Sequence, residues 1–550
     1  MIPPPIDRRT LLLGTLGAVA LAGCGTDAGS PTAPNNNAKV KLPTYKPFTG
    51  GPKPDLPGTP EGVLDGFLKY PADPIKVTGG APGDGSTVTT FVQTFSPVSP
   101  GASSNRYWQE LNKALNIDLK ISVVPASEYT QKFTAIVAGD ELPDLLHVRN
   151  PTIDIPAFLN AKCQDLTPLL AEGAVNEYPF LANIQPVFWK QCIHNGAIYG
   201  VPVPRAVQGL LMFRRDDLIS AKGLNPDPSS FGEFRELCQG LTEPRANRWA
   251  LTGPDITVNF VLQMLGVPGN WKDDGGKLTN IIELEQYKQA LADAAQLFKD
   301  GVIHPDSFPG PNANLAATYK QWFTAGSAVL NVDNYTAWPE YYTQNISGPS
   351  FKLGGMLPPN HDGSTKAVTW QGNPSFSFTA FKKAPEARIK QLLRICDWLA
   401  APFGSAEYLL TNYGAENVGW QRNADGDPVQ TDTGKAEVPG LGVKYIAAPP
   451  FVLYTPGQPQ ATKDGHAYQL KSVPISVGDP TLGMYSPTSS RQNASLNTQL
   501  TDARHAVIRG EKPVSSWDET VEQWRQSGGD QIRSEFEQAL AQNSQSVGER

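Results

Sequence analysis

The sequence predicts an α/β protein of two domains that follows an export signal and a linker. After residue 86, β-branched stretches alternate with stretches of helical apolar spacing, which indicates a parallel sheet covered by helices. About 470 residues follow the linker, too many for one hydrophobic core and enough for two domains. The first 24 residues combine a charged start with an apolar run, the pattern of a signal peptide.

The amino-terminal segment predicts export and a lipid anchor. Arg8 and Arg9 precede an apolar run at residues 11–22, which is too short to span the roughly 30 Å hydrocarbon core of a bilayer. The run ends in LAGC, which resembles a bacterial lipobox and marks Cys24 for lipidation. The expected location is the outer face of the cell membrane. "DRRTLLLG" resembles a twin-arginine signal, and Sec export is the alternative route.

Residues 25–85 differ in composition from the rest of the chain. They are rich in Pro, Gly, Asn and Thr and poor in apolar residues, so they cannot bury enough surface to fold alone. We therefore expect a flexible tether between the lipid anchor and a soluble body.

Net charge argues against a nucleic-acid partner. The formal net charge is −7 and the isoelectric point is about 5.5, whereas a nucleic-acid-binding surface is basic. Lys and Arg are scattered, with no basic run interleaved with aromatic residues.

Four cysteines follow Cys24, and their spacing fits no metal site because no C-x-x-C occurs. Cys238 and Cys396 lie on apolar helix faces and are expected to be buried thiols. Cys163 and Cys192 lie in loop-like sequence, so either a disulfide or two free thiols is compatible with an exported protein.

The order of these segments resembles the extracellular solute-binding proteins of bacterial ABC importers that bind sugars and oligosaccharides. The opening "LNKALNIDLKISVVPASEYTQKFTAIVAGDELPDLL" is similar to the family's helix–strand–helix start. "NGAIYGVPVPRAVQGLLMFRRDDL" resembles its first interdomain crossing. "FTAGSAVLNVDNYTAW" resembles its strand before an aromatic-bearing helix, and the segment from "FTAFKKAPEARIK" to "ENVGW" resembles its second crossing. The longer insertions resemble the subgroup that handles complex or acidic oligosaccharides.

The resemblance implies a two-lobe periplasmic-binding-protein type fold with a central ligand cleft and interdomain crossing strands. The first lobe is expected at residues 86–204 and 351–399, and the second at 205–350 and 400–550. The resemblance implies that the protein is the solute-binding component of an ABC importer. Such a component captures a carbohydrate and delivers it to the permease subunits, and this chain is expected to be monomeric.

Ligands of open α/β sheets sit beyond the carboxyl ends of the strands. We therefore expect the site among polar and aromatic residues that follow predicted strands. The candidates are Phe95, Ser96, Arg149, Asn150, Arg205, Asp333, Asn334, Tyr335, Trp338, Trp370, Gln371, Asn373, Glu416 and Trp420.

This mixture suits a sugar. Aromatic rings offer rigid contact area to the C–H face of a pyranose, and amide, carboxylate and guanidinium groups satisfy its hydroxyls. Arg149 and Arg205 are the residues expected to meet an acidic sugar. A surface ion pair is the alternative for each of them.

The stretch "VDNYTAWPEYY" contains four aromatic residues. Tyr335 and Trp338 directly follow a predicted strand and are expected at the cleft. Tyr341 and Tyr342 lie further along the helix and are expected in the core.

Catalysis and cofactors are not expected. The sequence has neither G-x-S-x-G nor H-E-x-x-H, and its six histidines lack ligand spacing. Residues 423–434 lack the calcium-loop pattern and predict a solvated hairpin instead. One alternative is a binding protein of the same shape for a peptide or other polar solute. The other is a cell-surface carbohydrate-active enzyme, because Asp and Glu are plentiful and the sequence does not exclude a catalytic pair of carboxylates.

Overall fold

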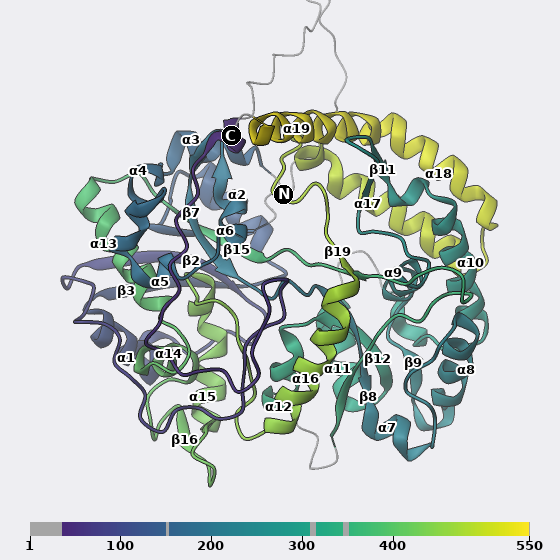
Figure 1. Cartoon of the computed structure of the whole chain (residues 1–550), viewed down its shortest axis with the longest axis horizontal. Coiled ribbons are helices and arrows are strands. Elements are labelled where there is room, and N and C mark those ends of the chain that lie inside the picture. Colours follow the sequence, from purple (N-terminus) through teal and green to yellow (C-terminus); the bar gives the residue numbers. More distant parts are fainter. Residues whose placement is uncertain (1–35, 150–152, 309–314, 345–350, 549–550) are drawn as a thin grey trace, which may run out of the picture. The chain divides into compact units, whose positions relative to one another are not determined.

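The computed structural model describes residues 36–149, 153–308, 315–344 and 351–548. The predicted signal peptide with Cys24, and the candidate site residue Asn150, lie outside these residues. The described chain contains two main sheets, each with its own helices and core (Figure 1).

The first sheet has five strands in the order β3-β2-β4-β15-β7. Strands β3, β2 and β4 run parallel, and β15 is antiparallel to both of its neighbours. Helices on both faces bury β2 almost completely, which is why its burial does not alternate along the strand; only Thr87 is exposed and even Gln93 is buried. The strands are β2 (Thr87–Thr94), β3 (Asp118–Pro125), β4 (Leu145–Val148), β7 (Gly200–Pro204) and β15 (Ser375–Phe381).

The second sheet has four strands in the order β13-β8-β12-β9, with β8 antiparallel to both neighbours. Its central strands are buried between helices and contribute Met212, Val329 and Leu330 to the second core cluster and Leu211 and Phe213 to the third. The strands are β8 (Leu210–Arg215), β9 (Trp249–Leu251), β12 (Ala328–Asn334) and β13 (Leu353–Met356). We call each sheet with the residues packed on it a lobe.

The helices divide between the two lobes. Those of the first lobe are α1 (Arg106–Leu115), α2 (Tyr129–Ala138), α3 (Ile155–Lys162), α4 (Thr167–Leu170), α5 (Pro179–Ala182), α6 (Pro186–Trp189), α13 (Glu386–Leu399), α14 (Ala406–Tyr413) and α15 (Asp432–Glu437). Those of the second are α7 (Asp216–Ala221), α8 (Phe231–Leu241), α9 (Pro254–Met264), α10 (Glu285–Lys299), α11 (Leu315–Ala325), α12 (Ala337–Gln344), α16 (Pro459–Ser472), α17 (Pro487–Ile508), α18 (Trp517–Trp524) and α19 (Asp530–Gly548).

Local sequence sets the helix ends. The Asn105 side chain accepts the N–H of Trp108 and begins α1, and Asn116 ends it in the left-handed region at φ 50°. Ser230 caps α8 by accepting the N–H of Glu233 with its side chain.

The chain passes between the lobes at different residues from those expected. The first passage, from β7 to β8, is where the sequence predicts it. Residues 353–356, assigned to the first lobe, instead form β13 beside β8 in the second sheet. Residues 400–447, assigned to the second lobe, instead pack on the first: α14 and α15 contact α1, and residues 438–447 bury apolar side chains in the first core. The chain returns to the second lobe only through β18 (Leu453–Tyr454) and α16. The hydrophobic pattern of such a segment indicates that it is buried. It does not indicate which of the two cores the segment enters.

The expected tether is wrong for residues 36–85. Val63, Phe67 and Tyr70 are buried, and β1 (Gly66–Phe67) pairs in parallel with β18. The Tyr70 hydroxyl donates to the Ser405 carbonyl at 2.7 Å. A segment with so few apolar residues cannot fold alone, but each of them can enter a core that the body has already built.

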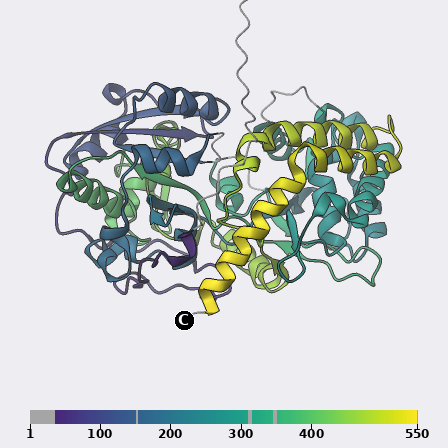
Figure 2. The ribbon, with the colours of Figure 1, turned by 90° about the horizontal axis from the view of Figure 1, so that it is seen from above.

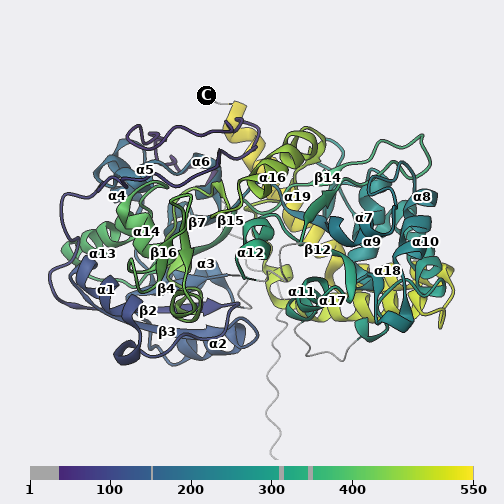
Figure 3. The ribbon, with the colours of Figure 1, turned by 90° about the horizontal axis from the view of Figure 1, so that it is seen from below.

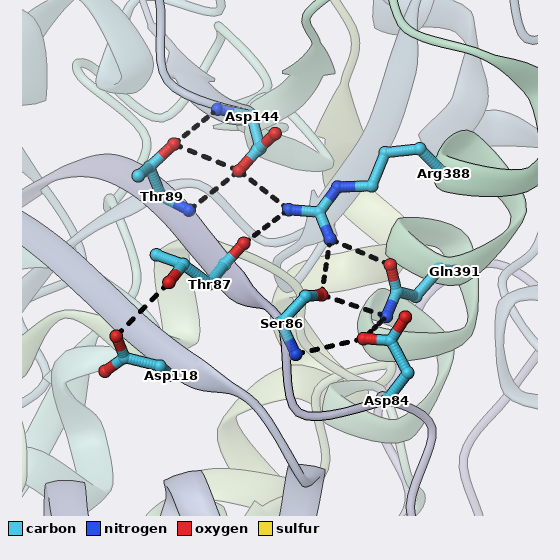
Figure 4. Close-up of polar contacts among 8 residues, drawn as sticks. All are labelled: Asp84, Ser86, Thr87, Thr89, Asp118, Asp144, Arg388 and Gln391. Atoms are coloured by element: carbon cyan, nitrogen blue, oxygen red, sulfur yellow. Dashed lines mark hydrogen bonds and ion pairs between the residues drawn. The ribbon is translucent and has the colours of Figure 1, made fainter.

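A polar network fixes this segment and α13 at the amino end of β2 (Figure 4). Arg388 Nη2 donates to the Thr87 carbonyl at 2.6 Å and to Asp144 at 3.0 Å, and its Nη1 donates to the Ser86 hydroxyl at 2.9 Å. The Asp84 carboxylate accepts from Gln391 Nε2 at 2.6 Å. The network lies at the opposite end of the sheet from the strand carboxyl ends, so its role is structural.

The four later cysteines are buried free thiols. Cys238 and Cys396 are therefore as predicted, and of the two possibilities left open for Cys163 and Cys192 the structure has the thiols. Residues 423–434 include the turn of the predicted hairpin, between β16 (Trp420–Arg422) and β17 (Pro428–Gln430).

The carboxyl-terminal helix α19 runs from α18 toward the start of the described chain (Figure 2). It contacts η1 (Asn36–Lys39), whose Asn37 accepts the Gly196 N–H on the first lobe at 2.9 Å. The remaining two-stranded pairs are β5 (Ile193–His194) with β6 (Ala197–Ile198), β10 (Trp271–Asp273) with β11 (Leu278–Asn280), and β14 (Thr369–Trp370) with β19 (Ser476–Val477).

Candidate functional site

Arginine and aromatic side chains meet at the carboxyl ends of the first-sheet strands. Phe95, Arg149 and Arg205 directly follow β2, β4 and β7. Because β15 is antiparallel to β4 and β7, its first residues lie at the same edge, and Phe376 joins the group. The Arg149 and Arg205 guanidinium carbons lie 4.5 and 4.6 Å from the centroid of the Phe376 ring. Three of the sequence-predicted residues are therefore brought together.

The aromatic members of this cluster include one exposed ring. Phe95 has 57% of its surface exposed, although it is large and apolar. Its ring meets Phe376 edge-on at 6.0 Å and Tyr445 at 6.2 Å, and Arg149 lies 5.6 Å from its centroid. An exposed ring supported on the half-buried Phe376 and the buried Tyr445 is the kind of platform that a pyranose face packs on.

Both guanidinium groups lack a carboxylate partner among the described residues. Arg205 Nη1 donates to the Pro204 carbonyl at 3.2 Å, and its guanidinium carbon lies within 5.8 Å of the Phe376 and Tyr445 ring centroids. Burial lowers the pKa of Arg149 and of Arg205 from the usual value, but a guanidinium keeps its charge. Desolvated cations without counter-ions are costly, and an anionic ligand offsets that cost.

The segment that carries Tyr445 closes one side of the cluster. The Tyr445 carbonyl accepts from the Thr379 hydroxyl at 3.3 Å and lies 3.1 Å from His147 Nδ1. Burial lowers the pKa of His147 to about 3, so the imidazole is neutral and its Nδ1 carries the proton that the carbonyl accepts. Lys444 extends from the same segment, with its Nζ 5.4 Å from the Tyr445 ring centroid.

The second lobe contributes charged residues from β12, α11 and α12. The Asp333 carboxylate, near the end of β12, accepts from the Tyr341 hydroxyl at 3.0 Å and lies 3.8 Å from Lys320 Nζ. Glu340 lies 3.2 Å from Lys320 Nζ and 3.4 Å from Lys444 Nζ. The last contact joins the two lobes, and α12 lies between the strands of the two sheets in Figures 1 and 3.

Electrostatics differ between the two carboxylates. Burial raises the pKa of Asp333 above its usual value, and nearby Lys320 only partly offsets this. Burial also acts to raise the pKa of Glu340, but Lys444 and Lys320 together outweigh it and lower the pKa to about 2. Glu340 is therefore ionised at any physiological pH.

Sequence reasoning missed Phe376, Tyr445, Lys444, Lys320 and Glu340. Phe376 was within reach, because it is an aromatic residue three positions after the candidate Asn373. Lys320 and Glu340 occupy ordinary helix positions, and "LGVKYIAAPP" around Lys444 carries no strand or helix signal. Only the tertiary structure brings these five together.

The aromatic stretch 332–342 requires a correction. Tyr335 is 0% and Trp338 is 1% exposed, and Trp338 Nε1 donates to the Ala461 carbonyl at 2.9 Å. Neither ring offers a face to a ligand in this structure, because α16 covers both. Tyr341 and Tyr342 are buried as predicted, although the Tyr341 hydroxyl reaches Asp333.

Trp420 is corrected in the same way. It is buried, and its Nε1 donates to the Gly414 carbonyl at 2.9 Å. A small core with Phe67 and Tyr70 surrounds it, which explains why an aromatic residue is needed there. Glu416 is exposed and lies 3.7 Å from Arg422, the contact of a surface ion pair.

Other predicted residues support the passage between the lobes. Trp370 Nε1 donates to the Val267 carbonyl at 2.8 Å, and Gln371 Nε2 donates to the Ser476 hydroxyl at 3.1 Å. The side-chain Oδ1 of Asn373 accepts the N–H of Ser375 at 3.0 Å.

Two of the predicted site residues form hydrogen bonds within local turns. The backbone N–H of Ser96 donates to the Thr94 hydroxyl at 3.1 Å. The Asn334 side chain accepts from the N–H and the hydroxyl of Thr336 at 3.1 and 2.9 Å. Contact of Ser96, Asn334, Trp370, Gln371, Asn373 or Glu416 with a ligand stays a prediction.

A separate hollow of about 680 Å³ lies between α4 and α13. Its lining includes Asp165, Glu177 and Lys390 and shares no residue with the arginine cluster. It is away from the strand carboxyl ends, so the cluster is the better candidate site. Within the described ranges, no group of three or more His, Cys, Asp or Glu side chains could hold a metal ion. No helix in this part of the chain is both long and apolar enough to cross a membrane.

Two lobes with polar and aromatic groups at the strand carboxyl ends are typical of a solute-binding protein. Residues 107–415, more than half of the chain, match the family described as bacterial extracellular solute-binding protein. The chain belongs to this family.

Two curated relatives come from Bacillus subtilis. The polygalacturonan/rhamnogalacturonan-binding protein YtcQ is 24% identical over 80% of this chain and 88% of its own. Lipoprotein LipO is 22% identical over 83% of this chain and 93% of its own.

Solved structures show the same two-lobe fold. The alginate-binding protein AlgQ2 superposes with a TM-score of 0.61 at 17% identity, covering 84% of this chain and 99% of that one. An extracellular solute-binding protein from Bifidobacterium longum subsp. infantis gives 0.63 at 13% identity, over 85% and 100%.

Proposed function

We propose that this protein captures an acidic oligosaccharide between its lobes and delivers it to the permease of an ABC importer. The carrying observation is the pair of guanidinium groups on Phe376, which have no carboxylate partner among the described residues. A uronate supplies both a carboxylate for the cations and a C–H face for the exposed ring of Phe95.

The relatives support an acidic carbohydrate. YtcQ is named for binding polygalacturonan and rhamnogalacturonan, and AlgQ2 for binding alginate. All three names refer to polymers that contain uronic acids. The ligand binds the closed arrangement of the two lobes more tightly than the open one. Binding therefore shifts the hinge motion toward closure.

The rest of the proposal concerns location and chemistry. A lipid on Cys24 holds the protein on the outer face of the cell membrane, and the body is monomeric. It needs no cofactor and performs no catalysis, so its ligand leaves the site unchanged.

Calorimetry tests this function with three ligand classes: uronate oligosaccharides, their methyl esters, and short peptides. We expect binding of the free acids and at least tenfold weaker binding after Arg205→Met, because a charge-assisted pair contributes about 1.5–3 kcal/mol. The control is Arg394→Met on α13, where the arginine is exposed. Binding of peptides alone, or release of product from a labelled oligosaccharide, would show that the protein has another function.

A further inference from the structure

Glu340 bridges a cation from each lobe. Its carboxylate lies 3.2 Å from Lys320 Nζ on α11 and 3.4 Å from Lys444 Nζ on the first lobe. Within the described residues, Glu340 is the carboxylate that pairs with Lys444. Arg205 lies close enough for its charge to contribute to lowering the Glu340 pKa.

Each cation has a second contact besides Glu340. The backbone beside Lys444 is fixed by the bonds to the Tyr445 carbonyl from Thr379 and His147, and Lys444 Nζ lies 5.4 Å from the Tyr445 ring centroid. Lys320 Nζ rests 4.9 Å from the Tyr341 ring centroid. Among the described residues, the charged groups of the site are Arg149, Arg205, Lys320 and Lys444 against Asp333 and Glu340.

We propose that Glu340 is an internal counter-ion that a ligand carboxylate replaces at Lys444, and that it thereby limits the preference for acidic over neutral oligosaccharides. The inference rests on the proposed function. The carboxylate of an acidic ligand can take the place of the Glu340 carboxylate in the ion pair with Lys444. Until Glu340 has moved away, its negative charge repels that ligand. A neutral ligand offers no carboxylate, so the Glu340–Lys444 pair persists and does not weaken the binding of that ligand.

The test is Glu340→Gln in the full-length chain, with calorimetric titration of trigalacturonate and of its trimethyl ester. Half-exposed ion pairs contribute about 0.5–1 kcal/mol, so we expect trigalacturonate to bind about two- to fivefold more tightly to the variant. The methyl ester should bind both proteins equally. Loss of affinity for either ligand would mean that Glu340 contacts the ligand directly and would overturn the proposal.

Glu243→Gln is the matched control for charge. Glu243 also bridges two cations, Lys222 at 2.9 Å and Arg248 at 3.1 Å, but on the far part of the second lobe. The Glu243→Gln substitution removes the same charge as Glu340→Gln but lies outside the candidate site. An equal gain in trigalacturonate affinity from this variant would assign the effect to net charge and contradict the proposal.

A double-mutant cycle with Lys444→Gln locates the exchange. The gain from E340Q should disappear in the K444Q background, because no cation is then released. A gain that persists there overturns the proposal. If the wild-type chain binds trigalacturonate and E340Q binds it no better, only this inference fails. If the wild-type chain binds no uronate at all, the proposed function fails and this inference with it.

Discussion

The buried carboxyl group of Asp397 makes stability depend on pH. Asp397 lies on α13, and its Oδ1 accepts the N–H groups of Phe180 and Leu181 at 2.8 and 3.0 Å, in the first turn of α5. Burial raises the pKa of Asp397 from 3.8 to about 7, against the lowering effect of the two N–H donors. The folded protein therefore keeps a proton that the unfolded chain loses near pH 4.

The sign and size of the effect follow from linkage. Between pH 4 and 7 the folded state binds more protons, so the free energy of unfolding falls as pH rises, by up to about 4 kcal/mol for this group. Asp397→Asn removes the titration and leaves an Oδ1 that can accept both N–H groups. We expect equal stability of the two proteins near pH 4, and an advantage for the variant of roughly 1.4 kcal/mol per pH unit up to pH 7.

Urea unfolding followed by circular dichroism at pH 4, 5.5 and 8 measures this difference. Asp300→Asn is the control of opposite sign, because the hydrogen bond from Arg235 lowers the pKa of Asp300. That variant should lose stability at pH 8 and lose less as pH falls. A pH-independent difference between Asp397→Asn and the wild type would refute the reasoning.

Two further changes test the fold. Arg388→Met should lower the free energy of unfolding by about 2–4 kcal/mol, because it leaves the partly buried Asp144 carboxylate with only its Thr89 donors and no cation, and removes a donor from the Thr87 carbonyl. Arg394→Met on the exposed face of α13 should change it by less than about 0.5 kcal/mol, and equal losses in urea titration would contradict the network of Figure 4. Trp338→Phe should cost about 1–3 kcal/mol of stability and leave ligand affinity within twofold, since the ring is core. A tenfold loss of affinity without loss of stability would return Trp338 to the ligand site.

Part of the candidate site was predictable because its residues directly follow strands of the sheets. Arg149 and Arg205 directly follow buried strands, and the carboxyl ends of such strands meet at one edge of a sheet. Asp333 was found by the same rule at the end of β12. Tyr335, Trp338 and Trp420 satisfied the same rule and were placed wrongly, because α16 and the segment at residues 63–70 cover them. Aromatic residues after a strand look alike in sequence whether or not another element packs over them.

The sequence by itself determined the α/β class, the first passage between the lobes and the buried thiols at Cys238 and Cys396, because these depend on local periodicity. Only the tertiary structure decided that residues 36–85 pack on the body and that residues 438–447 belong to the first lobe. It alone placed Glu340 between Lys320 and Lys444. These contacts join residues far apart in the chain, and their energy comes from burial and charge that no local pattern records.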